Sequence, residues 1–536
     1  MNTQSTVTDR IIRVLLLLVP PAMGCMALWL GQDASWDLRN YHFYNPFAFL
    51  TGRMGYDIAM GQVATYYNPL MHVPFYLAMT NLPPKAVGVF LGAIQGLNVF
   101  PLYAIVDKVI DPLRASKSKW ISLAITLLGF LCATNLSETG TSFGDNVISL
   151  LVLSAIWLII SQIDRIKEAR LLGIVIAGVA GLPAGAAFGL KQPFAVYSVG
   201  LFAAFWGLPV SMKRRFELSF FFGLGVLGGV VLTGGFWMVE MWRRFGNPLF
   251  PYFNLYFQSP WGASESYRDV RFIPTDLLSF FIFPLQTIWN PLKVGEVPFR
   301  DLRIPILYLL LIALFAKKVV SLFHRTAADR DIEMIAIRRF ILISIIISYT
   351  LWMKIFAIGR YMIVCDFMAP LIIFVVLGML VRSKRRHKWF SISIFILIIV
   401  TLQPGNWSRR PWSSDYFGVQ VPLIDKPADT IVVAVGHDPM SYLVPFFPPQ
   451  VRFLRIQSYM TGPSSHPNAL DRLMKSIVGD HIGPLFLIYR SHEEEIAINA
   501  LQAYGLLLNK SDCSKFTPHI EPIREDPFCF CPVMKK

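Results

Sequence analysis

Charged residues are scarce in this sequence. Asp, Glu, Lys and Arg make up 15% of its 536 residues, against about 25% in an average soluble protein. Hydrophobic residues make up 54%. So few charges cannot cover the several water-facing domains that a soluble chain of this length would contain, so most of the chain is expected to face lipid. With 6 cysteines and no repeat, the sequence also excludes a disulfide scaffold and a collagen-like fibre.

Apolar runs long enough to cross about 30 Å of hydrocarbon recur along residues 1–403. We predict two long outside loops, 31–85 and 240–303, although 240–303 could instead hold two further spans. The eleven predicted membrane spans are centred on 14–30, 87–106, 120–133, 146–163, 171–189, 194–210, 218–239, 304–316, 340–357, 361–380 and 389–403.

Basic residues are distributed unevenly between the two ends of these spans. With the N-terminus inside, the inside segments carry 23 Lys and Arg, whereas the short outside turns carry three. This bias follows the positive-inside rule and predicts that the tail from 404 lies outside. The net charge of +15 therefore reflects membrane topology, and we expect no nucleic-acid partner.

The tail 404–536 has the composition of a soluble domain. TIVVAVG, VRFLRIQS and PLFLIYRS are typical of strands, and HEEEIAINALQAYG is typical of a helix, which predicts a small extracytoplasmic α/β domain. The turn His437-Asp438-Pro439 could be catalytic but is more often a structural cap. Cys513 is expected to form a disulfide with Cys529 or Cys531, in preference to a zinc site.

The first long loop mixes aromatic rings with hydrogen-bonding groups, a combination that suits the apolar faces and polar edges of a sugar. We predict that residues 36–50 form a helix along the membrane surface, on which Asp37 and Tyr41 share a face. His42 and His72 have no partner at i+4, so hydrogen bonding is favoured over metal binding for both.

Ionisable residues near the membrane are candidates for function. Glu138 and Asp145 lie in the turn 134–145, which has no Lys or Arg; Asp145 could cap the following helix, belong to a site, or do both. Asp366 lies inside an apolar run. It could belong to the functional site, or it could be a structural carboxylate that is paired with a nearby basic residue. Lys191 and Arg360-Tyr361 close short outside turns, where an anionic headgroup would lie.

Four short motifs are similar to those of a known superfamily: SWDLRNYHFYNPFAFLTGR, FGDN, FGNPLFPYFN and GRYMIVCDFMAP. With one span before a large outside loop, the sequence resembles the integral-membrane GT-C glycosyltransferases, which include aminoarabinose transferases and protein O-mannosyltransferases. The resemblance implies a polytopic α-helical membrane protein of the GT-C type, with about 11 transmembrane helices and a C-terminal extracytoplasmic α/β domain. It would reside in the cell inner (plasma) membrane, with its active site extracytoplasmic.

This resemblance implies a hexosyl- or pentosyltransferase that transfers a sugar from a polyprenyl-phosphate donor to a glycan, lipid or protein, with inversion. It implies Asp37 as general base and Asp145 as a second acidic residue. Substrate contacts are expected from Tyr41, His42, Glu138, Lys191, Arg360, Tyr361 and Asp366. Many members have two adjacent acidic residues in the first loop, whereas here Leu38 follows Asp37, so we expect no metal and no other cofactor.

Two other functional classes remain open at this point. A lipid-linked sugar flippase or secondary transporter would share the membrane spans, but transporters usually contain internal repeats, and the two halves of this sequence are not similar. A polysaccharide polymerase or ligase would share the outside loops. A receptor or structural role is a third alternative.

Overall fold

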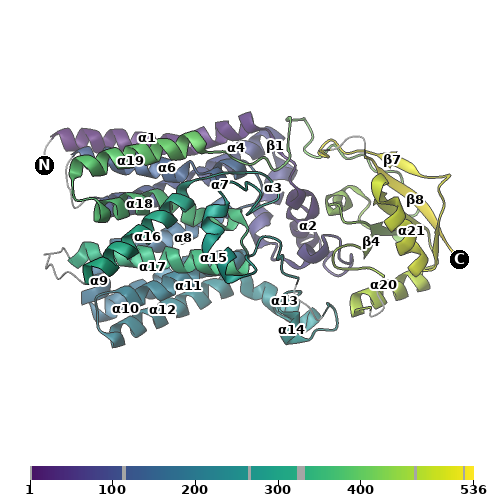
Figure 1. The fold of residues 1–536 in the computed structure, drawn as a ribbon. Coiled ribbons are helices and arrows are strands. Elements are labelled where there is room, and N and C mark those ends of the chain that lie inside the picture. Colours follow the sequence, from purple (N-terminus) through teal and green to yellow (C-terminus); the bar gives the residue numbers. More distant parts are fainter. Residues whose placement is uncertain (1–2, 111–115, 264–266, 323–331, 464–466, 523–525) are drawn as a thin grey trace.

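The computed structural model describes residues 3–110, 116–263, 267–322, 332–463, 467–522 and 526–536. The molecule is elongated (Figure 1), with helices side by side at one end and a β-sheet with two helices at the other. The N-terminus lies at the far end of the helices and the C-terminus at the far end of the sheet. Short helical segments of the first long loop separate these two regions.

Helices lie at all eleven segments where spans were predicted. Within the described residues, six helical stretches are long and apolar enough to cross a membrane: Val7–Leu30, Pro84–Ile110, Arg170–Leu190, Met212–Phe245, Ala336–Ile355 and Gly359–Leu380. The number of crossings beyond these six stays a prediction. The helices of this region are α1 (Thr3–Leu30), α4 (Pro84–Gly96), α5 (Val99–Ile110), α6 (Ser116–Phe130), α7 (Ala133–Glu138), α8 (Asp145–Ser161), α9 (Ile163–Glu168), α10 (Arg170–Leu190), α11 (Ala195–Ala204), α12 (Met212–Val230), α13 (Phe236–Phe245), α16 (Arg303–Leu322), α17 (Ile332–Ile355), α18 (Ile363–Leu380) and α19 (Lys384–Thr401).

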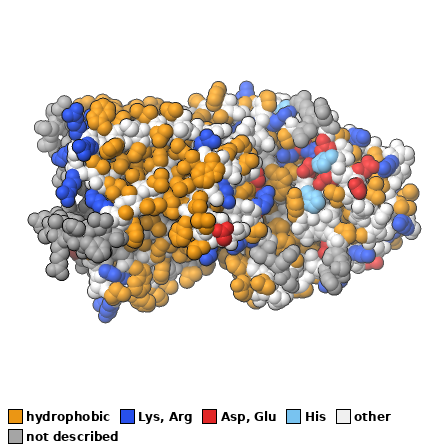
Figure 2. All heavy atoms as spheres, in the orientation of Figure 1, with side chains coloured by type: hydrophobic (Ala, Val, Ile, Leu, Met, Phe, Trp, Pro, Cys, Tyr) orange, Lys and Arg blue, Asp and Glu red, His pale blue; other side chains and the backbone are white. Residues whose placement is uncertain are grey.

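The surface of the helical region is that of a membrane protein. Figure 2 shows hydrophobic side chains covering this region on the visible face, with Lys and Arg gathered at the end where the N-terminus lies. Over the sheet region, acidic, basic and polar side chains are mixed. This distribution agrees with helices that face lipid and with a basic end on one side of the membrane.

Helices α10 and α12 are in backbone contact. A Cβ atom added at Gly185 of α10 would lie 1.9 Å from the carbonyl oxygen of Val226, and one added at Gly225 of α12 would lie 1.9 Å from that of Gly178. Small residues allow this close approach in membranes, where van der Waals packing holds helices together. The contact fixes the C-terminal end of α10, from which Lys191 extends.

The C-terminal region is an α/β domain, as predicted. Its sheet has the order β4-β3-β5-β8-β6, and β7 pairs with β8. The fully buried β3 runs parallel to β4 and β5, whereas β8 runs antiparallel to β5, β6 and β7. The elements are β3 (Ile431–Val435), β4 (Arg452–Gln457), α20 (Ala469–Asp480), β5 (Leu485–Arg490), α21 (Glu494–Ala503), β6 (Leu506–Leu508), β7 (Ser514–Phe516) and β8 (Phe528–Lys535). A disulfide joins Cys513 to Cys531, one of the two predicted pairings, and Cys529 is a buried free thiol.

The stretch 36–50 is helical, as predicted, but much of it is buried, and its place along the membrane surface stays a prediction. This stretch contains a π-helical turn, η1 (Leu38–His42), followed by α2 (Tyr44–Leu50), and every residue of η1 is buried. The reason is that the soluble domain packs on the loop: Ser441 donates a hydrogen bond to the Asn40 carbonyl, and Ile58 forms a parallel bridge with Leu454 of β4. The first loop, which also contains α3 (Val73–Asn81), is therefore an interior layer.

The second long loop contains only short helices in its described part, 240–263 and 267–303. These are the end of α13, α14 (Asn254–Phe257) and α15 (Leu277–Gln286). The apolar α15 has 10 residues, which span about 15 Å, half of the hydrocarbon thickness. This length favours the prediction of a loop over the alternative of two further spans.

Candidate active site

An ion pair between Asp37 and Arg360 forms the centre of the site. Arg360 Nη1 donates to Asp37 Oδ2 at 2.6 Å, and each side chain is 12% exposed. Asp37 directly precedes the π-helical turn η1, and Arg360 lies in η8 (Gly359–Met362), immediately before α18. Residues 323 positions apart in the sequence thus meet beside the membrane helices.

Aromatic rings hold the Arg360 guanidinium. Its Cζ lies 4.4 Å from the ring centre of Phe143, 5.4 Å from that of Tyr361 and 5.7 Å from that of Trp407. Contacts of this kind stabilise a cation by about 0.5–2 kcal/mol each, and more when water is excluded. Arg360 Nε forms no hydrogen bond with any described part of the chain, so the guanidinium is fixed in place yet retains donors for a ligand.

A second ion pair lies beside the first. Lys191 Nζ is 2.7 Å from Asp145 Oδ1 and donates to the Phe143 carbonyl at 3.0 Å. It also lies 5.3 Å from the centre of the Tyr361 ring. The N-cap of α8 is Gly144, with a φ of 73°, and Asp145 makes no capping hydrogen bond. Of the two alternatives for Asp145, the structure therefore supports membership of this cluster over the helix cap.

Glu138 is a buried carboxyl group close to both pairs. It ends α7 and is fully buried. Burial raises the pKa of Glu138 well above its usual range, and the negative charge of Asp145 raises it further, while Lys191 and Arg360 act in the opposite direction. Two cations therefore serve three carboxyl groups, which favours the neutral form of Glu138.

Tyr41 and two histidines form an adjoining wall. The rings of His42 and His72 stack at 4.0 Å, and Tyr41 meets His42 edge-on at 4.3 Å. His42 Nδ1 is 2.7 Å from Ser142 Oγ, which donates to Asp33. Burial lowers the pKa of His42 well below its usual range, and that of His72 to about 3. Both rings are therefore neutral at physiological pH.

The structure places Asp366 in a different cluster. Thr134 Oγ1 donates to Asp366 Oδ2 at 2.7 Å, and the buried Arg303 donates to the Asp366 carbonyl at 3.2 Å. Arg303 also pairs with Asp301 at 2.7 Å. Asp366 Oδ1 is buried without a hydrogen bond to the described residues, and Asp366 does not contact Asp37 or Arg360 within the described residues. The available signal for this cluster was an arginine at the start of a predicted span.

Sequence reasoning missed a short strand pair next to the site. Gln32–Asp33 (β1) pairs with Arg409–Arg410 (β2), immediately after the last long helix. Arg409 donates to the carbonyls of Ser137 and Thr139 at 2.9 and 2.6 Å. This pairing brings Trp407 to 5.1 Å from Phe143. The only available signal was the presence of Trp407 just beyond the last predicted span.

Metal-binding geometry is found elsewhere among the described residues. The only group of three or more candidate ligand atoms within 4.8 Å of one another belongs to Asp438, His492 and Asp526, in the soluble domain. Asp37 and Asp145 each have a cationic side chain as partner.

No protein-family profile matches this chain, and no curated protein matches it. Among solved structures, the chain is similar to the crystal structure of the Archaeoglobus fulgidus oligosaccharyltransferase in the apo form. The TM-score is 0.43 and the sequence identity is 12%, over 89% of this chain and 70% of that chain.

Proposed function

We propose that this protein is a membrane glycosyltransferase of the GT-C type, which transfers a hexosyl or pentosyl group from a polyprenyl-phosphate donor to an acceptor hydroxyl. The observation that carries the proposal is the meeting of Asp37, Arg360, Asp145 and Lys191 in one aromatic-walled cluster beside the membrane helices. Two fixed cations suit a phosphate, and a carboxylate beside them suits a proton acceptor. The acceptor is a glycan, a lipid or a protein.

Arg360 has N–H groups that can still bind the phosphate of the lipid-linked sugar. A guanidinium has five N–H groups, and Asp37 accepts from Nη1 alone, while Nε makes no hydrogen bond within the described chain. The Lys191 ammonium has three N–H groups, and it contacts two acceptors, the Asp145 carboxylate and the Phe143 carbonyl. Arg360 can therefore hold a phosphate oxygen without releasing Asp37.

The transfer follows from this arrangement. Asp37 takes the proton of the acceptor hydroxyl as its oxygen forms a bond to the anomeric carbon. The bond from that carbon to the phosphate oxygen breaks on the opposite face, and the lipid phosphate leaves with the electron pair. Arg360 and Lys191 stabilise the charge on the leaving group. Displacement from the opposite face inverts the anomeric configuration.

We also propose that the site and residues 404–536 lie on the extracytoplasmic side of the cell inner membrane. The support is the basic end of the helical region in Figure 2, which is opposite the sheet domain. No metal or other cofactor takes part in this proposal.

Replacement of Asp37 tests the proposed base. Asp37→Asn keeps the shape of the side chain and removes the proton acceptor, so the transfer rate should fall by at least about 10²-fold. Donor binding should persist because Arg360 and Lys191 remain. The measurement is sugar transfer from an extracted lipid-linked donor, with the exposed Asp425→Asn as matched control. Transfer at the wild-type rate would show that Asp37 is not the base. A transporter would move the lipid across vesicles without forming a glycosidic bond.

A further inference from the structure

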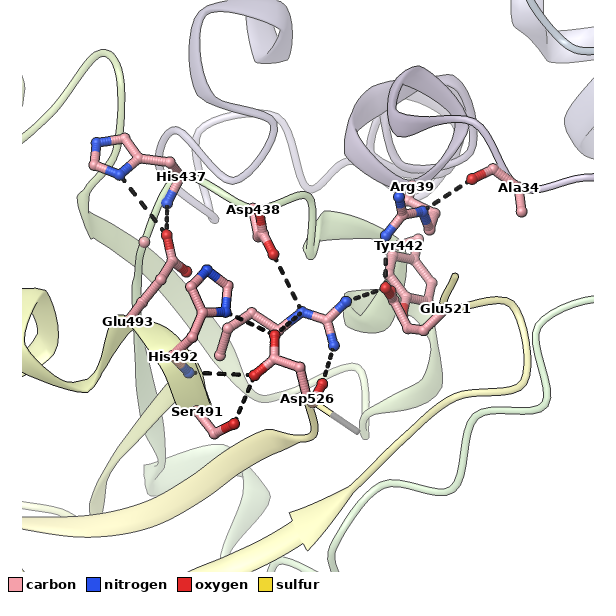
Figure 3. A network of polar contacts seen from close by, with 12 residues as sticks. Ala34, Arg39, His437, Asp438, Tyr442, Ser491, His492, Glu493, Glu521 and Asp526 are labelled. Carbon is pink, nitrogen blue, oxygen red and sulfur yellow. Dashed lines mark hydrogen bonds and ion pairs between the residues drawn. The ribbon is translucent and has the colours of Figure 1, made fainter. Parts of the chain in front are cut away.

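A cavity lies between the first loop and the soluble domain. Its volume is about 680 Å³, within the range of pockets that bind small molecules. Trp36 and Arg39 line it from the first loop, and Asp438, Arg490, His492 and Asp526 line it from the soluble domain. Figure 3 shows the contact between His492 and Asp526, with Asp438 nearby and with Glu521 on the side toward Arg39.

Two buried arginines form the floor of this cavity. Arg39 Nη1 donates to Glu521 at 2.6 Å, and Arg490 Nη2 and the Tyr442 hydroxyl bond the same fully buried carboxylate. Arg39 Nε donates to the Ala34 carbonyl, which leaves Nη2 without a hydrogen bond in the described chain. Arg490 has no nitrogen to spare, because Nη1 donates to the Asp526 carbonyl and the buried Nε faces Asp438 and Asp526. Both side chains are at least nine-tenths buried and line the cavity, and Arg39 Nη2 is the nitrogen that can donate to a ligand.

The cavity also has hydrogen-bond acceptors. Asp438 Oδ2 lies 3.5 Å from Arg490 Nε, and its side chain is 38% exposed. Asp526 accepts from Ser491 Oγ at 2.6 Å and pairs with His492 Nδ1 at 2.7 Å. Asp526 is thus held in place by its neighbours, while Asp438 has free acceptor positions.

The charges decide which ligand suits the cavity. The two guanidinium groups face the three carboxylates of Asp438, Asp526 and Glu521, so the cavity has no excess positive charge to attract a phosphate. A divalent cation is disfavoured because Arg490 Nε already lies 3.5 Å and 3.9 Å from the two aspartates that would bind it. A neutral ligand with hydroxyl groups can use both the donors and the acceptors.

Trp36 adds an apolar surface to this polar floor. Its side chain is large, lines the cavity and is 40% exposed. A flat aromatic face suits the C–H face of a sugar ring, and carboxylate and guanidinium groups suit its hydroxyls. Trp36 also directly precedes Asp37, so one stretch of chain contributes to both the cavity and the candidate active site.

We infer that this cavity binds a neutral oligosaccharide segment of the acceptor. The inference rests on the proposed function and specifies its acceptor as a glycan. The segment lies against Trp36, its hydroxyls donate to Asp438 and accept from Arg39, and its end extends toward Asp37. The loop and the soluble domain thus form the acceptor site together.

The test is binding of the full chain, in detergent, to an array of defined neutral hexose oligosaccharides and uronic-acid-containing oligosaccharides. Wild type and the transfer-deficient Asp37→Asn should both retain neutral oligosaccharides. Trp36→Ala and Asp438→Asn should each weaken that binding by about tenfold. The matched controls, Trp289→Ala and Asp425→Asn, replace exposed residues outside the cavity and should bind as wild type does.

Two results would overturn the inference: neutral oligosaccharides bound equally by the cavity variants and by wild type, or stronger retention of the uronic-acid probes. If gel filtration shows that Trp36→Ala does not fold, the test is made with Asp438→Asn and His492→Gln. Because Asp37→Asn is part of the set, binding is read separately from transfer. If oligosaccharides do not bind but transfer depends on Asp37, only the proposed acceptor site is rejected. If they bind but no sugar is transferred, only the proposed transferase activity is rejected.

Discussion

The stability of the fold should fall when one charge of the Arg360–Asp37 ion pair is removed and should largely recover when both are removed. The two side chains are 2.6 Å apart and each is 12% exposed. Removing one partner of a buried pair costs about 3–5 kcal/mol, because the remaining charge is left uncompensated. Arg360→Met leaves the Asp37 carboxylate beside Asp145, and Asp37→Asn leaves the guanidinium without its anion. Each change alone should therefore destabilise the fold by at least about 3 kcal/mol.

The double variant, Asp37→Asn with Arg360→Met, buries two neutral groups instead of one unpaired charge. It should recover most of the stability lost in either single variant, which gives a coupling energy of at least about 5 kcal/mol. Thermal unfolding of the four proteins in detergent measures this cycle, and sugar transfer should stay absent in the double variant.

An exposed ion pair of this chain provides the control. Arg271 and Glu296 are 2.9 Å apart with side chains 64% and 43% exposed, so the same cycle there should give a coupling of no more than about 1 kcal/mol. Additive losses at Asp37 and Arg360, with a coupling equal to that of the control, would refute the reasoning that the site is a desolvated charge cluster.

Three further predictions concern other regions. Because the pKa of Glu138 is raised in the folded state, the wild type should lose stability as pH rises above the usual glutamate range, and Glu138→Gln should unfold at a higher temperature than wild type near about pH 8 but not near about pH 4. Cys513→Ser should cost the soluble domain about 3 kcal/mol in chemical denaturation, whereas Cys529→Ser, which removes a free thiol, should leave the disulfide intact in a thiol-alkylation assay. Reporter fusions should give a cytoplasmic signal at Lys384 and a periplasmic signal at Lys510, and a cytoplasmic signal at Lys510 would refute the proposed topology.

Elements that depend on local patterns could be predicted from the sequence. The apolar runs located the helices, and the strand-like runs located β3, β4 and β5. The helix over 36–50 could be predicted, but its burial could not, because that burial depends on a domain that lies about 400 residues further along the chain. A pattern of aromatic and polar residues has the same appearance at a membrane surface and at an interface between domains.

The candidate site was predictable as a set of residue types but not as a set of pairs. Acidic and basic residues near one end of the spans identified Asp37, Asp145, Lys191 and Arg360, yet their pairing depends on how distant helices pack. Asp366 has the same local signature, a carboxylate near the start of a predicted span. Its environment differs because Thr134 and Arg303 reach it from other helices, information that no local pattern contains.

The strand pairing between Gln32 and Arg410 affects how this protein can be recombined with others. The polypeptide leaves the last long helix at Thr401 and, before it enters the soluble domain, adds Trp407 to the surroundings of Arg360. A chimera joined at 403 would therefore replace one wall of the candidate active site together with the domain. A chimera joined beyond Arg410 would keep that wall and exchange only the surface that we propose for acceptor binding. Grafting at this second junction is the route to altering acceptor choice while preserving the chemistry.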